Sequence, residues 1–445
     1  MKRLSAILLF AGAMMCTFSQ SVKADADRAH TLKVYNWADY IDEDLIPEFE
    51  QWYKENTGEE VHVLYQTFDI NEVMLTKIET GHEDYDVVCP SEYIIERMLK
   101  NDLLLPLDRN FGNVPDYTGN VSPFAVEKFD EMSAGGRRAS DYAVGYMWGT
   151  TGVMYNTAYV TREEASTWGI FWDPKYEGKI LMKDAVRDVY GSLMMYVRND
   201  EIKSGKVSRD VVMNDASDAM LQLFEDTLTS AKKNIAGWEV DFGKERMSQG
   251  KAWVNITWSG DAMWAIDEVS DEVTLDYVVP VEGSNVWFDG WVIPKYAQNV
   301  KAANWFINFM CTSENAIRNM EAIGYVSVIG TPEVLEYKID EDLDEVIDLT
   351  YFFGEGADSV KVNSIQYPDA KVIERCALMH DAGNRTEAML DMWSRIKGDS
   401  LHTTTLIVIA AAVVLIVAFI LVNNSKKNRK ARRKADAKKN SSRRG

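Results

Sequence analysis

Aromatic and acidic side chains are the groups in this sequence with the clearest chemical use, and they gather where short apolar runs end. Four such places carry them: Trp37 with Tyr40, Ser91 with Tyr93, Asp184 with Asp188, and Trp258 with Asp261. A ring face attracts a cation by about 0.5–2 kcal/mol, and a carboxylate holds an ammonium group through charge-assisted hydrogen bonds. Together these residue types favour a site for a small organic cation.

Three other interpretations of these residues stay open. The rings could be ordinary core or rim packing. Lys183 and Arg187, near a predicted helix N-terminus, could bind an anion. Asp184 and Asp188 are four residues apart at a predicted helix start, a spacing that resembles acid–base pairs, although carboxylates there more often cap the helix and meet solvent. The sequence contains no GxSxG, HExxH, P-loop or Cys-His pattern, so we expect no catalytic residues.

The elements that would position these residues alternate between strand and helix. In chain order the first ones are a strand at 32–35, a helix at 43–57 ended by Gly58, a strand at 61–65, a helix at 71–80 ended by Gly81, a strand at 86–89 and a helix capped by Ser91. The alternation resumes at 180–200 and 252–310. It predicts an α/β fold of two lobes with a mainly parallel sheet covered by helices. Because ligands bind beyond the carboxyl ends of such strands, the four places should line one crevice.

Composition narrows the class of protein. The 445 residues carry 48 Lys and Arg against 69 Asp and Glu, a net charge of −21. Nucleic acid is a poor partner for so acidic a chain, because phosphate binding needs a basic face. The five His and four Cys are scattered, so we expect no metal site and no other cofactor. Beyond Cys16 the three remaining cysteines are an odd number without a disulfide framework.

The two ends of the chain differ from its body. Residues 1–24 combine a basic start, an apolar run and small residues near their end, which is typical of a secretory signal peptide. Residues 403–423 include seventeen successive apolar residues, enough for a transmembrane helix. The tail 424–445 carries a net charge of +10. By the positive-inside rule this tail lies in the cytoplasm and the acidic body lies outside it.

Eight motifs occur here in the order typical of one family: VYNWADYI, YDVVCPSEYIIERM, GYMWGTTGVMYN, ILMKDAVRDVY, VNITWSGDAMWA, VWFDGWVIP, AIGYVSV and YPDA. Over residues 31–397 the chain resembles the periplasmic spermidine/putrescine-binding proteins of polyamine ABC transporters. The resemblance implies a two-lobed periplasmic binding protein fold with a hinged cleft. Lobe 1 would comprise residues 30–145 and 290–335, and lobe 2 residues 146–289 and 336–400, joined by crossing strands near 145 and 290.

The resemblance also implies which residues would contact a polyamine. By motif they are Trp37, Tyr40, Ser91, Tyr93, Asp188, Trp258, Trp287, Asp289 and Tyr325, with Asp184 beside the place of a second family acid. The rings would pack the methylene groups, and the carboxylates would fix the ammonium groups. Three family positions differ, which leaves the choice among polyamines open: Ala38 replaces a Thr, Ala185 an acid, and Met379 lies near the place of a Gln.

The resulting hypothesis is a membrane-tethered solute-binding protein that captures a polyamine and delivers it to an ABC permease. We expect a single-pass monomer in a bacterial inner membrane, with the binding domain in the periplasm. Two alternatives stay open. One is a tethered sensor that presents its ligand state to a partner receptor, and the other is a binding protein for a different small cation or anion.

Overall fold

One mixed sheet positions the rest of the structure. The computed structural model describes residues 28–240, 242–270 and 272–398. The strands are β1 (Thr31–Trp37), β2 (His62–Phe68), β3 (Val87–Val88), β4 (Ala143–Asn156), β5 (Ile180–Lys183), β6 (Ile235–Glu239), β7 (Val254–Trp258), β8 (Leu275–Val278), β9 (Ser284–Val292), β10 (Val326–Ser327) and β11 (Cys376–Ala377). Their main order is β2-β1-β3-β9-β4-β7-β5-β6, with β8 and β10 paired to β4 and β11 paired to β9.

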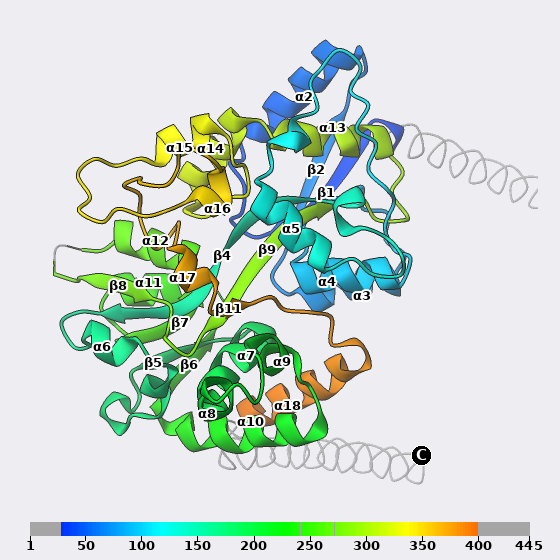
Figure 1. Ribbon diagram of the computed structural model, residues 1–445. Helices are drawn as coiled ribbons and strands as arrows, with labels where there is room; N and C mark the ends of the chain where they lie inside the picture. Colours follow the sequence, from blue (N-terminus) through cyan, green and yellow to red (C-terminus); the bar gives the residue numbers. More distant parts are fainter. Residues whose placement is uncertain (1–27, 241, 271, 399–445) are drawn as a thin grey trace, which may run out of the picture. The chain divides into compact units, whose positions relative to one another are not determined.

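Strand β4 pairs with different strands along its length. Its residues 143–150 pair with β9, and its residues 151–156 pair with β7 and β8. All its residues are buried. Figure 1 shows β4 and β9 side by side through the middle of the fold, with β1 and β2 towards one end and β5, β6 and β7 towards the other. These two long strands therefore connect β1, β2 and β3 with β5, β6 and β7, and we call these two sets the two strand groups.

The direction of the strands differs between the ends of the sheet and its centre. Strands β1, β2 and β3 run parallel, as do β5, β6 and β7. Strands β4 and β9 are antiparallel to each other, and β4 is also antiparallel to β7, β8 and β10. The α/β class is confirmed, but the prediction of a mainly parallel sheet is wrong for its centre. Local alternation of strand and helix cannot reveal this, because β4 and β9 are joined by more than a hundred residues.

The helices lie between and around these strands. They are α2 (Leu45–Thr57), α3 (Asn71–Glu79), α4 (Glu92–Lys100), α5 (Pro123–Glu131), α6 (Arg162–Ala165), α7 (Val186–Val197), α8 (Asn199–Lys203), α9 (Arg209–Asn214), α10 (Asp218–Ala231), α11 (Gly243–Ser248), α12 (Ser259–Asp267), α13 (Val300–Met310), α14 (Ser313–Ile323), α15 (Pro332–Lys338), α16 (Thr350–Phe353), α17 (Ala370–Ile373) and α18 (Thr386–Gly398). The predicted end of the first helix is confirmed, since Gly58 adopts a left-handed φ of 74° and its N–H donates to the Lys54 carbonyl at 2.9 Å.

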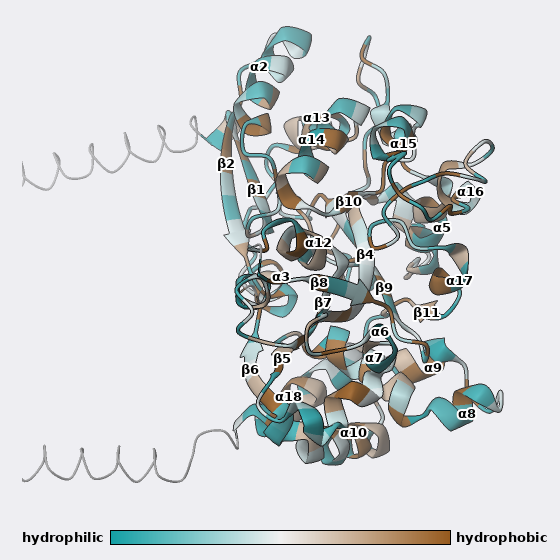
Figure 2. Cartoon of the chain, turned by 90° about the vertical axis from the view of Figure 1, so that its left-hand side faces the viewer, coloured by the Kyte–Doolittle hydropathy of each residue, from teal (hydrophilic) through white to brown (hydrophobic). Residues whose placement is uncertain are grey.

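Burial follows the hydropathy of each helix. Most of α7 is buried, including its apolar residues Val189, Leu193 and Met194, whereas α8 has no buried residue. In Figure 2 the same difference is visible as brown segments in α7 and a mainly teal α8. Helix α7 is therefore a core helix, and a polar residue within it needs a specific partner.

The predicted features at the two ends of the chain lie outside the described residues. The predicted signal peptide 1–24, the predicted transmembrane segment 403–423 and the tail 424–445 all belong there. Among the helices of the described residues, none combines the length and the apolar character that crossing a membrane requires. Residues up to Met389 form one unit, which holds the whole sheet, and a second unit begins at Leu390 within α18.

Candidate ligand-binding site

Asp289 in β9 forms the centre of one polar cluster. Its Oδ1 accepts a hydrogen bond from the Ser91 hydroxyl at 2.7 Å, and its Oδ2 accepts one from the Tyr40 hydroxyl at 2.8 Å. Ser91 occupies the predicted N-cap position of α4, but its side chain does not cap the helix, because the hydroxyl is engaged by Asp289. The sequence therefore located Ser91 correctly and assigned its side chain the wrong partner.

Burial changes the acidity of this carboxyl group. Asp289 is only 6% exposed, and burial raises its pKa to about 7, with a further rise from the nearby charge of Asp188. The hydroxyl donors of Ser91 and Tyr40 lower the pKa only in part. No cationic side chain is paired with Asp289 among the described residues. A buried carboxylate with neutral partners alone is well suited to receive a cation from outside.

Helix α3 supplies two residues that extend this cluster. The Asn71 amide donates to the Ser91 hydroxyl at 3.0 Å and to the Tyr93 hydroxyl at 3.1 Å. Tyr93 in turn donates to the Glu72 carboxylate at 3.1 Å. The sequence analysis missed Asn71 and Glu72, although a polar pair opening a helix directly after a strand was a signal that could have found them.

Asp188 forms the centre of a second cluster. It lies in the first turn of α7 and accepts a hydrogen bond from the Trp258 indole N–H at 2.9 Å. The Asn285 amide lies 3.5 Å from the same oxygen. Asp188 is 9% exposed, and burial raises its pKa more than these donors lower it. Like Asp289, it is a buried acid whose hydrogen-bond donors are neutral.

A buried lysine lies beside this second cluster. The Lys183 ammonium is 3.9 Å from the centre of the Trp258 ring and 2.8 Å from an Asp261 carboxylate oxygen. The other oxygen of Asp261 accepts from the Tyr325 hydroxyl at 2.8 Å. Burial opposes the ionisation of Asp261, but the charges of Lys183 and Lys244 and the hydrogen bonds from Lys183 and Tyr325 together outweigh it, so the pKa of Asp261 is lowered. The sequence placed Asp261 among the aromatic and acidic groups but did not foresee this ion pair.

Tyr325 contacts the first cluster through its ring and Asp261, beside the second cluster, through its hydroxyl group. Its ring centre is 5.1 Å from that of Tyr40 and 5.6 Å from that of Trp287. Trp287 and Asp289 thus both reach the Tyr325–Tyr40 ring pair, whereas Phe288 between them stacks on Trp148. This matches the period of a strand, in which alternate side chains share a face.

Two glycines make room for these rings. A Cβ atom added to Gly260, at the start of α12, would lie 2.3–2.4 Å from ring carbons of Tyr325. One added to Gly149 in β4 would lie 2.6 Å from the Trp287 ring. Such distances are far below van der Waals contact, so both positions require glycine for the rings to lie where they do.

Two predicted residues stand apart from the clusters. Trp37 ends β1 and packs on Phe68, with ring centres 4.6 Å apart, and its indole N–H is buried without a hydrogen-bond partner among the described residues. The sequence interpretation placed Asp184 and Asp188 on the same helix, and this is wrong. Helix α7 begins at Val186, and Asp184 continues from β5, its N–H donating to the Glu239 carbonyl at 2.6 Å.

The structure also locates the positions where the family pattern is broken near the C-terminus. The sulfur of Met379 lies 3.9 Å from the Asn285 amide, which contacts Asp188. His380 lies beside Glu96 in α4, with 3.0 Å between the ring Nδ1 and the carboxylate. Met379 is therefore next to the second cluster, while the imidazole of His380 is directed to α4.

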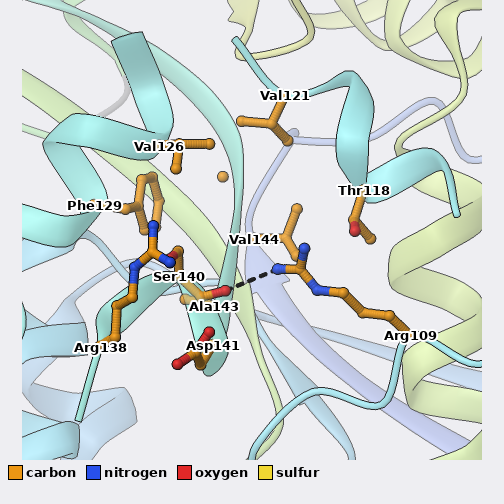
Figure 3. A pocket seen from close by; sticks show the side chains of 11 residues that line it. Arg109, Thr118, Val121, Val126, Phe129, Arg138, Ser140, Asp141, Ala143 and Val144 are labelled. Atoms are coloured by element: carbon orange, nitrogen blue, oxygen red, sulfur yellow. Dashed lines mark hydrogen bonds between the residues drawn. The ribbon is translucent and has the colours of Figure 1, made fainter. Parts of the chain in front are cut away.

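A cavity of about 140 Å³ lies away from both clusters. Figure 3 shows Val126 and Phe129 of α5 at this cavity, with Arg109 and Arg138 on opposite sides. Arg109 donates to the Ser140 carbonyl at 2.8 Å, and Arg138 pairs with Asp130. None of the predicted site residues lines it. Within residues 28–240, 242–270 and 272–398, the structure shows no group of three or more His, Cys, Asp or Glu side chains placed to hold a metal ion.

Known proteins resemble this chain over most of its length. The sequence profile of the bacterial extracellular solute-binding proteins matches residues 46–343. The spermidine/putrescine-binding periplasmic protein of Escherichia coli (strain K12) is 28% identical over 399 residues, which are 89% of this chain and 99% of that protein. The putrescine-binding periplasmic protein PotF of the same strain is 28% identical over 68% of this chain and 78% of its own length.

A solved structure agrees with these relatives. The spermidine/putrescine ABC transporter substrate-binding protein PotD from Streptococcus pneumoniae, determined in complex with calcium and HEPES, superposes with a TM-score of 0.59 at 31% identity. The superposition covers 83% of this chain and 98% of that one. Fold and sequence thus lead to the same family, whose members bind solutes and are not enzymes. The chain belongs to the bacterial extracellular solute-binding proteins.

Proposed function

We propose that this protein binds a linear polyamine between the two strand groups, with Asp188 and Asp289 each holding one ammonium group. The observation that carries the proposal is that both acids are buried and have only neutral hydrogen-bond donors. The contacting residues would be Trp37, Tyr40, Ser91, Tyr93, Asp184, Asp188, Trp258, Trp287, Asp289 and Tyr325. The relatives named above, which are described as spermidine/putrescine-binding and putrescine-binding, support the same ligand class.

The two strand groups would act as the two lobes. Lobe 1 would hold residues 30–145 and 290–335, and lobe 2 residues 146–289 and 336–400. Strands β4 and β9 would be the crossing strands, since β4 changes partners between Thr150 and Thr151. Closure about such a connection would bring the Asp289 cluster and the Asp188 cluster onto opposite ends of one ligand and exclude water.

The protein would pass its ligand to an ABC permease. A helix formed by residues 403–423 would keep it at the inner membrane as a single-pass protein, and tethering would raise its effective concentration beside the permease. The alternative is a tethered sensor. Purification of the protein with a permease would support delivery, and purification with a signalling receptor instead would support the sensor.

Calorimetric titration of the full-length protein tests the ligand class. Putrescine or spermidine should bind in a one-to-one ratio and change the tryptophan fluorescence, because Trp258 and Trp287 lie at the site. Phosphate, sulfate and a neutral sugar serve as controls. Tight binding of one of these controls with no response to any polyamine would contradict the proposal.

A further inference from the structure

Lys183 is a positively charged side chain built into a site that we have assigned to a positively charged ligand. It is the last residue of β5 and is 1% exposed. Its ammonium donates to the Asp261 carboxylate and to the Val240 carbonyl, and lies 3.6 Å from Glu239. A lysine is rarely buried this completely unless it is paired, and here it is paired within the candidate site.

The position of this ammonium is that of a bound amine. It lies over the face of Trp258, 3.9 Å from the ring centre, and is salt-bridged to Asp261 at 2.8 Å. An aromatic face together with a carboxylate is the same combination that would receive an ammonium group of the ligand. One cation position of the site is thus filled by the protein itself.

We propose that Lys183 acts as a resident ammonium group that restricts the site to diamines and disfavours longer polyamines. The inference rests on the proposed polyamine function and narrows it to one ligand class. Lys183 would thus determine specificity in two ways. It neutralises Asp261, and it repels a third positive charge of a longer ligand.

The hydrogen-bond and ion-pair partners of Asp188, Asp261 and Asp289 support a ligand with two charges. Asp261 is paired with a protein cation, whereas the donors to Asp188 and Asp289 are neutral. Of these three aspartates, two are therefore left for two ligand ammonium groups, while burial raises the pKa of the neighbouring Glu72 and Glu92 and favours their neutral form.

Trp258 contacts both Lys183 and Asp188, which is the proposed partner of one ligand ammonium group. Its indole N–H binds Asp188, while its face carries Lys183. An ammonium held by Asp188 would lie at one edge of the indole, and a chain extended beyond it would bring a third charge towards Lys183. Like charges at such a distance in a buried site repel strongly, so a triamine should bind less well than a diamine.

The test compares putrescine with spermidine on the full-length protein by calorimetry. The wild-type protein should prefer putrescine. Replacing Lys183→Met removes the resident charge and frees Asp261, so the preference should shift towards spermidine by roughly tenfold, as for a gained charge-assisted hydrogen bond. Lys183→Arg keeps the charge and should retain the wild-type preference.

A second variant covers the case in which Lys183→Met fails to fold because Asp261 is left buried without its partner. Lys183→Met combined with Asp261→Asn removes both charges, and should still shift the preference towards spermidine, although by less. Lys179→Met is the matched control, since Lys179 is exposed and lies 4.8 Å from the centre of the Trp253 ring, outside both clusters. It should leave the preference unchanged.

The outcomes separate this inference from the proposed function. A wild-type preference for spermidine, or an unchanged preference in both Lys183 variants, overturns the diamine restriction while polyamine binding stands. Equal loss of both affinities together with a lower melting temperature would show a structural lysine and also overturn it. Failure of the wild-type protein to bind either amine contradicts the proposed function itself.

Discussion

Asp289 and Asp188 are buried acids to which the described residues supply no ion-pair partner, although the nearby charge of Lys183 partly offsets the burial that raises the pKa of Asp188. Each is less than a tenth exposed, and each accepts hydrogen bonds from neutral donors. Burying a carboxylate in this way is unfavourable unless its charge is compensated. A cation that binds there would compensate the buried charge, and this compensation would contribute to its binding free energy.

The first prediction concerns the charge of Asp289. Asp289→Asn keeps the size of the side chain and removes the charge, so polyamine affinity should fall by roughly 1.5–3 kcal/mol, the value for a hydrogen bond to a charged group. The fold should remain intact, because the amide oxygen can accept from one of the two hydroxyl groups and the amide N–H can donate to the other. Calorimetric titration measures the change. Asp102→Asn, the same change at an exposed residue paired with Lys295, is the control and should have no effect.

The second prediction concerns pH. Burial raises the pKa of Asp289 to about 7, above the value of about 3.9 in an unfolded chain, so the folded state binds this proton more tightly. The stability that this group contributes is therefore full in acid, below about pH 4, and is lost as the pH rises through 7. Burial raises the pKa of Asp188 in the same direction.

Ligand affinity should show the opposite trend. An amine remains protonated up to about pH 10, and it binds the ionised form of Asp289, so affinity should fall as the pH is lowered from 8 to 6. Melting curves between these pH values, with and without polyamine, measure both trends. In Asp289→Asn both slopes should flatten. A ligand affinity that rises towards acid would contradict the assignment.

At the scale of elements, helix α12 positions three parts of the site at once. Trp258 stands at its N-cap, Asp261 lies in its first turn, and Gly260 lies against the ring of Tyr325. The third prediction uses this contact. Gly260→Ala would normally favour a helix by up to about 1 kcal/mol. Here the added methyl group overlaps the Tyr325 ring, so we expect destabilisation by roughly 1–3 kcal/mol, typical of overpacking, and weaker polyamine binding.

Gly119→Ala is the matched control for this substitution. An added Cβ at Gly119 meets nothing within 4 Å, so the same chemical change should leave the melting temperature and the affinity as they are. Equal behaviour of the two variants would show that the Tyr325 ring can move aside at no cost.

Sequence reasoning succeeded where an element is defined by its own residues. Helix α2 and its end at Gly58 were predicted because the apolar spacing and the cap are local. The start of α7 was misplaced, because Asp184, directly after β5, donates its N–H to the Glu239 carbonyl, which is more than fifty residues away in sequence. The order of the central strands was missed for the same reason.

In the candidate site, too, the sequence predicted residues from local motifs but not their partners that are distant in sequence. The positions of Ser91, Trp258 and Asp289 followed from motifs, and the structure brings most of the predicted residues together in two clusters. The partners that determine their chemistry were not visible. The ion pair of Lys183 with Asp261 joins residues 78 positions apart, and Asn71 contacts Ser91 across 20 positions.

At the scale of the whole molecule, the fourth prediction concerns the anchor that the sequence indicates at 403–423. The full-length protein should fractionate with the inner membrane and resist extraction by salt or high pH, because the apolar segment is followed by a cluster of Lys and Arg. A chain ending at Ser400 should be released from the membrane and bind polyamine with unchanged affinity, since no proposed contact lies beyond that residue. Full-length protein recovered free in the periplasm, or loss of binding on truncation, would exclude the anchor.

The contacts of Asp289 have a consequence for the order in which the molecule folds. Tyr40 and Ser91 lie 249 and 198 residues before it, so both hydrogen bonds close long loops. Contacts at such separations form late, because the entropy of loop closure is paid before they are made. During refolding from denaturant, polyamine binding should therefore return only in the slowest phase, after most tryptophan fluorescence has recovered. A newly synthesised chain would likewise lack the Asp289 cluster until β9 has been made.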